Sequence, residues 1–237
     1  KFLRVAPTMP HSDIIVVHSS DLHIDDGYTA RAFNGDGNGP LRAVLSAAQE
    51  TVADIVLLTG DIFEHNRLPD NLLRQTAQIL EDAKTEIVIL PGNHDPAIDD
   101  SAYNRAGVSE PTNVHVLGVT HKLSVVFPKI DLEVWGHAHR DYDDMRPLRR
   151  PKTRTTKWQI AAAHGHYEAD PDLNTPLRPS WIISDEDIIA TGADYVALGH
   201  WNTPKRVARR SKICAHYSGS PDLARTVNVV LLKNSGR

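Results

Sequence analysis

The sequence predicts an α/β fold in which two mixed β-sheets pack together and are flanked by helices. Short apolar runs alternate with amphipathic stretches in the first part of the chain, which is typical of strands connected by helices. Further along, apolar runs follow one another with few helical stretches between them. A single α/β sheet followed by a strand-rich segment is best explained by two packed sheets.

The first part of the chain predicts a β-α-β-α-β series. Three apolar runs are expected to form buried strands, and two stretches that begin with proline have helical spacing. In order, these elements are Asp13–His18, Pro40–Ala53, Ile55–Thr59, Pro69–Asp82 and Glu86–Leu90. Such a series favours parallel strands joined by right-handed crossovers.

The second part predicts seven more strands and one helix. Ser184 is expected to cap a helix that ends near Gly192. The expected strands are Val114–Leu117, Leu123–Phe127, Leu132–Trp135, Trp158–Ala163, Tyr195–Leu198, Ile213–Tyr217 and Val227–Leu232. We interpret residues 1–237 as one domain, a length that suits a single large core.

The composition is that of an ordinary globular protein, with 41% hydrophobic and 24% charged residues. No apolar run approaches the roughly 20 residues that span a bilayer, so we expect no membrane partner. The single cysteine, Cys214, excludes an internal disulfide and fits a reducing, cytoplasmic compartment. The net charge of −4 argues against a broad polyanion-binding surface. Thirteen histidines are the unusual feature, because imidazole is a common metal ligand.

Metal-ligand residues follow five of the expected strands. Each group is ordinary alone, since Asp, Asn and Gly favour turns, but five groups in order are difficult to attribute to chance. In open α/β sheets, sites assemble beyond the carboxyl ends of strands, and carboxylate, imidazole and amide ligands suit Mn, Fe or Zn. In extended backbone Asp21 and His23 would point the same way. The groups are Asp21-x-His23, Gly60-Asp61, Gly92-Asn93-His94-Asp95, His164-Gly165-His166 and Gly199-His200-Trp201-Asn202.

This motif set resembles that of the calcineurin-like metallophosphoesterases. Within that superfamily, three stretches look closest to the SbcD-type DNA-repair exonucleases: His18–His23, Asp194–His200 and Tyr217–Pro221. The resemblance covers residues from about Ile14 to Leu232 and implies the two-sheet sandwich predicted above. It also implies a hydrolase for phosphate mono- or diesters, with nucleic acid or a nucleotide among the candidate substrates.

The resemblance implies a role for each motif residue. Asp61 would bridge two divalent metal ions, and Asn93 and His94 would also contact the substrate. His94 would donate a proton or bind phosphate, oriented by Asp95. One metal would be completed by Asp21, His23 and Asn202, and the other by Asn93, His164 and His200. Two cations roughly 3.5–4 Å apart can share a bridging hydroxide and neutralise an anionic ester.

Two departures from the family pattern concern its last motif, which is normally Gly-His-x-His. Here Asn202 replaces the second histidine, and an amide is a poorer ligand for such metals, so the Asp21/His23 site is expected to be weak. The segment Trp135–His139 contains Gly-His-Ala-His but precedes His164, whereas the family motif follows it. We therefore expect that neither His137 nor His139 binds a metal ion.

The substrate and the partners stay open at the level of sequence. The basic stretches 146–157 and 205–212 are either solvated loops or a cationic rim, and we assign substrate binding to Arg149 and Arg150. The SbcD-type nucleases carry a further DNA-capping domain, for which we find no counterpart here. The alternative from another class is a catalytically weak binding or scaffold protein that keeps the phosphoesterase fold. The oligomeric state is not indicated.

Overall fold

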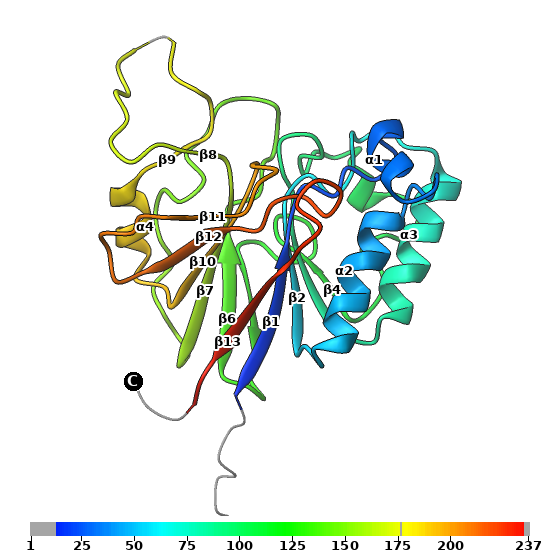
Figure 1. Cartoon of the computed structure of the whole chain (residues 1–237), viewed down its shortest axis with the longest axis horizontal. Coiled ribbons are helices and arrows are strands. Elements are labelled where there is room, and N and C mark those ends of the chain that lie inside the picture. The colour runs from blue at the N-terminus through cyan, green and yellow to red at the C-terminus, as the bar shows by residue number, and fades with distance from the viewer. Residues whose placement is uncertain (1–12, 176, 235–237) are drawn as a thin grey trace, which may run out of the picture.

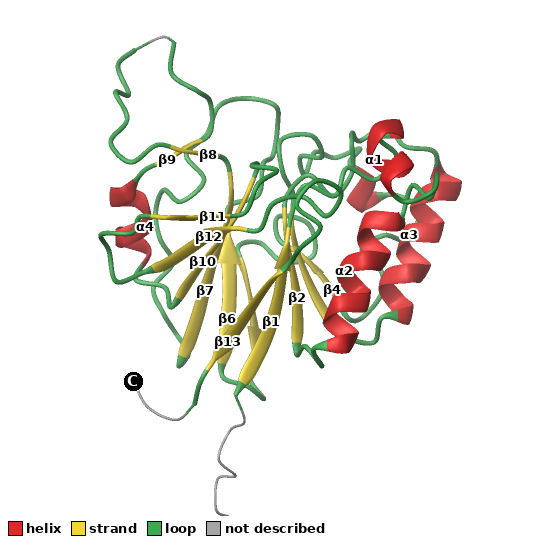
Figure 2. Cartoon of the chain, in the orientation of Figure 1, coloured by secondary structure: helices red, strands yellow, loops and turns green. Residues whose placement is uncertain are grey.

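The computed structural model describes residues 13–175 and 177–234 and arranges them in two large sheets with helices on their outer faces (Figure 1, Figure 2). The helices are α1 (Gly27–Ala32), α2 (Gly39–Glu50), α3 (Asp70–Asp82), α4 (Asp185–Thr191) and a 3₁₀ turn, η1 (Ala102–Asn104). The strands are β1 (Ile14–Ser19), β2 (Ile55–Thr59), β3 (Glu86–Leu90), β4 (Val114–Val116), β5 (Ser124–Phe127), β6 (Leu132–Gly136), β7 (Trp158–His164), β8 (His166–Tyr167), β9 (Ile182–Ile183), β10 (Tyr195–Gly199), β11 (Lys205–Val207), β12 (Cys214–Tyr217) and β13 (Asn228–Leu232).

The first sheet has the order β13-β1-β2-β3-β4, with β1 to β4 parallel and β13 antiparallel to β1. The second has the order β11-β12-β10-β7-β6-β5, and its four central strands are parallel. Both sheets therefore place the carboxyl ends of their central strands along one edge. Among the described residues, no helix has the length and apolar character needed to cross a membrane.

The alternation of side chains along the central strands builds three apolar layers. In β2, Ile55 and Leu57 face the other sheet, whereas Val56 and Leu58 pack under α2 and α3. In the second sheet, Ala161 and Ala163 of β7 pack against the α4 side. Every residue of β2 is buried, as expected for a parallel strand covered on both faces. The core between the sheets fixes their mutual position and hence the position of the shared edge.

The fold class and the predicted strands and helices are confirmed, with boundaries that shift by a few residues. Ser184 caps α4 through a reciprocal bond with Asp187, and Gly192 ends it in a left-handed conformation, as the sequence predicts. The sequence did not predict α1, β8, β9 or β11. These elements have two to six residues, too few to show a hydrophobic period.

The interface between the sheets contains one buried polar network around His18. The His18 ring is fully buried and bonds to the Tyr195 hydroxyl at 3.0 Å and the Thr59 hydroxyl at 2.9 Å. This confirms His18 as a core histidine whose hydrogen bonds are satisfied. Burial, reinforced by His216, lowers the pKa of His18 to about 3, so the ring is neutral in the folded protein.

We predict that His18 makes the fold sensitive to mild acid. Its pKa is lower in the folded chain than in the unfolded one, so its contribution is complete above about pH 6.5 and declines as the pH falls towards about 3. The free energy of unfolding should therefore lose about 2 kcal/mol from this group between pH 7 and pH 5. Urea unfolding of the native chain and His18→Gln at both pH values measures the difference. An equal loss in the two proteins would contradict the prediction.

Candidate metal centre

The two sheets are in direct contact at the carboxyl ends of β2, β7 and β10. The Thr59 carbonyl accepts a hydrogen bond of 2.9 Å from His164 Nδ1. A Cβ on Gly199 would lie 1.8 Å from the same carbonyl oxygen, so only glycine fits there. Because Nδ1 donates to a carbonyl, Nε2 is the His164 ring nitrogen that faces the edge of the sheets. The junction thus prepares His164 as a ligand.

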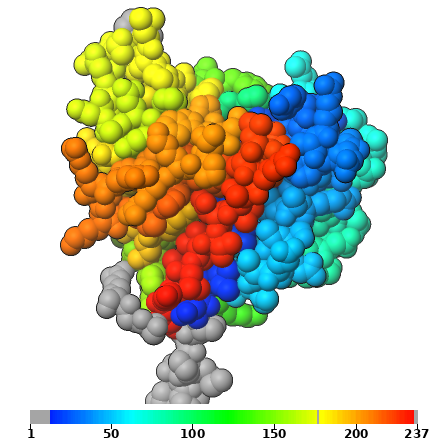
Figure 3. Space-filling view, viewed as in Figure 1, coloured from blue at the N-terminus to red at the C-terminus, as the bar shows by residue number. Residues whose placement is uncertain are grey.

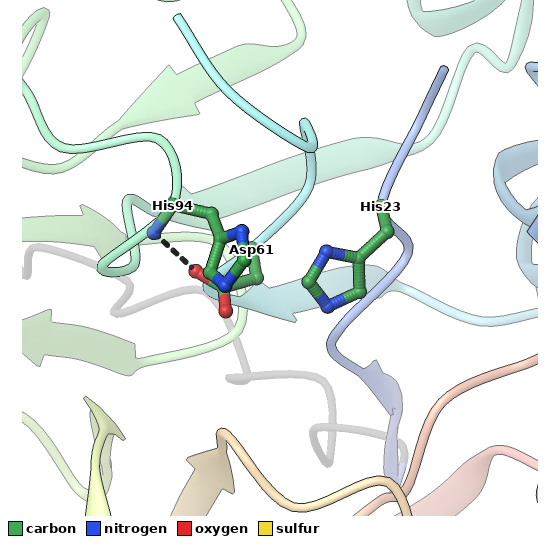
Figure 4. A group of neighbouring side chains, drawn as sticks. All are labelled: His23, Asp61 and His94. Carbon is green, nitrogen blue, oxygen red and sulfur yellow. Dashed lines mark hydrogen bonds between the residues drawn. The ribbon is translucent and has the colours of Figure 1, made fainter. Parts of the chain in front are cut away.

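Asp61 lies at the centre of the residues gathered at this edge. Its Oδ1 accepts a bond of 2.9 Å from the His94 backbone N–H, shown as a dashed line in Figure 4. Its Oδ2 lies 3.1 Å from His164 Nε2, and that nitrogen is 2.9 Å from the Asn93 side-chain oxygen. Asp61 therefore connects the loops after β2 and β3 to the end of β7.

Two groups of candidate metal ligands share Asp61. One consists of His23, Asp61 and His94, and the other of Asp61, His164 and His200. Within each group the ligand atoms lie within 4.8 Å of one another. A carboxylate common to two ligand groups is an arrangement that can hold a pair of metal ions close together.

Asp21 is buried beside this centre and fixes the end of β10. Its Oδ2 accepts bonds from the Ser20 hydroxyl at 2.5 Å and from the His200 backbone N–H at 2.9 Å. Asp21 and His23 have φ of 56° and 46°, which are left-handed values, so this segment is not extended. The extended backbone assumed for Asp21 and His23 from the sequence is therefore wrong, because β1 ends at Ser19.

The charges at the centre depend on one another. Burial disfavours charge on His164, but the Asp61 carboxylate outweighs burial and raises the pKa of His164 to about 9. Burial acts against ionisation of Asp61 too, yet His164 holds the pKa of Asp61 below its usual range. Burial, reinforced by His164, lowers the pKa of His200 to about 4. A metal ion that binds His164 must therefore displace a proton.

Asp95 stabilises the loops and does not orient His94. Its Oδ2 accepts bonds from the backbone N–H groups of Ile62 and Phe63 and from the Tyr103 hydroxyl, and its Oδ1 accepts one from Gly92 N–H. None of the hydrogen bonds found in the described part of the chain joins it to His94. The expected orienting contact is corrected, since this buried carboxylate accepts its four hydrogen bonds from other donors.

The residues of the last motif differ in how close they come to the centre. His200 belongs to one ligand group, whereas Asn202 is exposed, and within the described residues the hydrogen bond found for it is between its backbone carbonyl and Ser220 N–H. His139 is buried behind the centre and its Nε2 donates to the His164 carbonyl at 2.9 Å. His137 lies farther out, 3.4 Å from the Arg150 carbonyl.

The two basic stretches differ in their ion pairs. Arg146 pairs with Asp187, Arg154 with Asp194 and Lys152 with Glu133, so half of the cations of 146–157 stabilise the fold. Arg149 and Arg150 are exposed and line a cavity of about 620 Å³ that also borders His137 but neither Asn93 nor His94. In the part of the chain that the structure describes, Lys205, Arg206, Arg209, Arg210 and Lys212 form no ion pair.

Glu64 is a residue of the centre that the sequence analysis missed. Its Oε2 lies 2.7 Å from His23 Nδ1, and its Oε1 lies 3.7 Å from His94 Nδ1. A carboxylate on one imidazole nitrogen fixes the ring and makes the other nitrogen a better ligand. Its place three residues after Asp61, in the same loop, was the available signal.

Comparison with known proteins now gives the family. The profile of the calcineurin-like phosphoesterases matches residues 14–204, which include all the ligand candidates above. The chain belongs to this family. It is 25% identical over 211 residues to the DNA double-strand break repair protein Mre11 of Methanopyrus kandleri, covering 76% of this chain and 42% of that protein.

Two further likenesses agree with the family. The uncharacterized metallophosphoesterase YhaO of Bacillus subtilis is 24% identical over 211 residues, covering 80% of this chain and 48% of that protein. The chain thus spans less than half the length of both curated relatives. The crystal structure of TT1561 of Thermus thermophilus aligns with a TM-score of 0.57, covering 94% of this chain and all of that one, at 14% identity. The structural likeness supports the fold.

The residues of this centre fit a pair of divalent metals. Asp21 and Asp61 are each only 2% exposed, and carboxylates so deeply buried need compensating positive charge. Protonated His164 provides a single such charge. The surrounding oxygen and imidazole donors suit Mn, Fe or Zn.

We predict that Glu64 strengthens metal binding through His23. Glu64→Gln should weaken the affinity of one metal site by about 10–100-fold, because the amide supports the imidazole less well than a carboxylate. The measurement is manganese content and affinity by calorimetry. Glu81→Gln, an exposed substitution on α3, is the matched control. If the two variants hold manganese equally well, Glu64 has no such role.

Proposed function

We propose that this chain is a metal-dependent phosphoesterase that hydrolyses a phosphate mono- or diester. The observation that carries the proposal is the sharing of Asp61 by two groups of ligand residues at one sheet edge. Asn93, His164 and His200 would complete one site with Asp61. Asp21 and His23 would complete the other, whereas His94, which lies in the His23 group, would act on the substrate. When bound, two such ions supply positive charge for the phosphate oxygens and an activated water.

The protein's own residues position the ester and handle the proton. The side chains of Asn93 and His94 line a cleft of about 710 Å³ that also includes Glu64. His94 has a side chain that is 41% exposed, so it can reach a bound ester, and its Nδ1 lies 3.1 Å from the Glu64 carbonyl. That contact would hold Nδ1–H and leave Nε2 to bind phosphate or to protonate the leaving oxygen. We assign this role to His94 and a structural role to Asp95.

Within this class, the substrate is either nucleic acid or a smaller ester. The relatives named above include a DNA double-strand break repair protein, and the unpaired cations of 205–212 could bind a polyanion. The paired cations of 146–157 and the net charge of −4 favour a smaller ester. The alternative function is a binding or scaffold protein with weak catalysis, for which the exposed Asn202 is the supporting observation.

The first test separates ligands from the proton donor. His94→Ala should keep its metal yet lose about 10²–10⁴ in turnover of bis(4-nitrophenyl) phosphate, the usual size of acid–base catalysis. Asp61→Ala should lose metal as well as turnover, because both ligand groups depend on it. Metal analysis and rates of both variants check the assignment. It fails if His94→Ala loses metal or Asp61→Ala retains it, and a native chain that binds metal without turnover would favour the scaffold alternative.

The second test concerns unequal metal sites. At limiting manganese, one ion should occupy the Asn93/His164/His200 site while the Asp21/His23 site stays partly empty, because Asn202 contributes little. Asn202→His should supply the missing imidazole and lower the manganese concentration needed for the half-maximal rate. Calorimetric titration and rate measurements give both quantities. Two equally tight sites, unaffected by the substitution, would contradict the prediction.

A further inference from the structure

The catalytic cleft has two aromatic side chains that the hydrolysis of a phosphate does not require. Besides Asn93 and His94, the cavity of about 710 Å³ is lined by Tyr142 and Trp181. Both rings lie in connections between strands of the second sheet. Tyr142 is in the loop between β6 and β7, and Trp181 directly precedes β9 in the connection between β7 and β10. They come from the opposite sheet to the loops that provide Asn93 and His94.

Trp181 is held rigidly at the cleft in an unfavourable backbone conformation. Its φ is 55°, a left-handed value that is rare for a bulky residue and typical of functional sites. Its backbone N–H donates to Asp144 Oδ1 at 2.7 Å, its indole N–H donates to the Asp143 carbonyl at 3.0 Å, and its carbonyl accepts from His166 N–H at 3.0 Å. The ring lies edge-on to His200, with 5.8 Å between the centroids. The indole therefore lies next to a ligand candidate of the metal centre.

Tyr142 is the less constrained ring of the pair. It is 59% exposed, so core packing does not explain it, and it directly precedes the two aspartates that hold Trp181. The exposed carboxylate of Asp100 lines the same cleft and could accept a hydrogen bond. Aromatic faces with a hydrogen-bond acceptor suit a flat heterocycle with amino groups better than a plain hydrocarbon.

We propose that Tyr142 and Trp181 form a subsite for a nucleobase whose phosphate is bound beside Asn93 and His94. The proposal rests on the proposed function, since the phosphate position is that of the hydrolysed ester. The base would stack on the indole or the phenol ring, an interaction that every base can make. A free nucleotide and a single strand share this chemistry.

The experiment compares two ligands that differ only in the base. The probes are 2′-deoxyadenosine 5′-phosphorothioate and 2-deoxyribose 5-phosphorothioate, chosen for slow hydrolysis, and the dissociation constants are measured by calorimetry on the manganese-loaded chain. The nucleotide should bind roughly 5- to 150-fold more tightly, the size of one stacked base. Trp181→Ala should remove most of this difference and leave the affinity of the base-free ligand unchanged.

Variants and a longer ligand complete the design. Trp181→Phe keeps an aromatic face and should retain much of the preference, and manganese content shows that each variant is folded. Tyr28→Ala removes an exposed ring on α1, outside the cleft, and is the control for Tyr142→Ala. A short single-stranded phosphorothioate oligonucleotide that binds more tightly than the mononucleotide would indicate that the ligand is a nucleic-acid strand. Equal affinity for the two would indicate that the ligand is a free nucleotide. Either result supports the subsite.

Two outcomes overturn the proposal and can be told apart. Equal affinity for the two ligands, or an unchanged preference in Trp181→Ala, would overturn the base subsite. If the native chain still hydrolysed bis(4-nitrophenyl) phosphate, the proposed function would stand. A native chain that binds no metal and hydrolyses no ester would overturn the proposed function and, with it, the subsite.

Discussion

The hydrogen bond between the Thr59 carbonyl and His164 Nδ1 is the contact on which the centre depends. It joins the first sheet to the second at the edge where the parallel strands of both sheets end. It also directs His164 Nε2 towards Asp61. A side chain at Gly199 would separate the two sheets at this point, so the absence of a Cβ is as important as the imidazole. The same residues thus set the packing and the ligand geometry.

Backbone strain accompanies this convergence. Asp21, His23, Asp61 and His200 all have φ between 46° and 104°, although none is glycine. Each such residue costs about 1–3 kcal/mol and persists because its surroundings over-determine it. Asp95 is a main source of that restraint, since it ties backbone groups after β2 and β3 to each other and to Tyr103. The free energy gained from burying apolar side chains in three layers offsets the cost of this backbone strain.

The sequence predicted the long buried strands and the residues after them, because apolar runs and strand-end motifs are local features. It could not predict how Asp95 is used, since its partners are backbone groups and a tyrosine hydroxyl in other parts of the loops. Glu64 was missed because its place three residues after Asp61 does not reveal its contact with His23, and Trp181 was missed because its importance comes from three hydrogen bonds and a strained φ. The short β8 and β9 pair only through the tertiary fold. Long-range contacts, not local propensity, account for these omissions.

The distribution of charge separates binding at the centre from binding at the surface. Two buried carboxylates and the half-buried Glu64 surround the imidazoles, so the centre itself attracts cations strongly. Outside it, much of the apparent basic character of 146–157 is cancelled, because Arg146, Lys152 and Arg154 face carboxylates.

The surface in Figure 3 has the orange β11–β12 segment, which carries the unpaired cations of 205–212, on one side of the red β13 segment and the blue helices on the other. Long-range attraction would thus come from one region of the surface, whereas discrimination between esters would come from the groups that line the cleft beside His94. Electrostatic attraction at such a surface is screened within about 8 Å at physiological salt, and contacts inside the cleft are not. For an ester bound in this cleft, the shape and chemistry of the cleft would therefore matter more than the net charge of the chain.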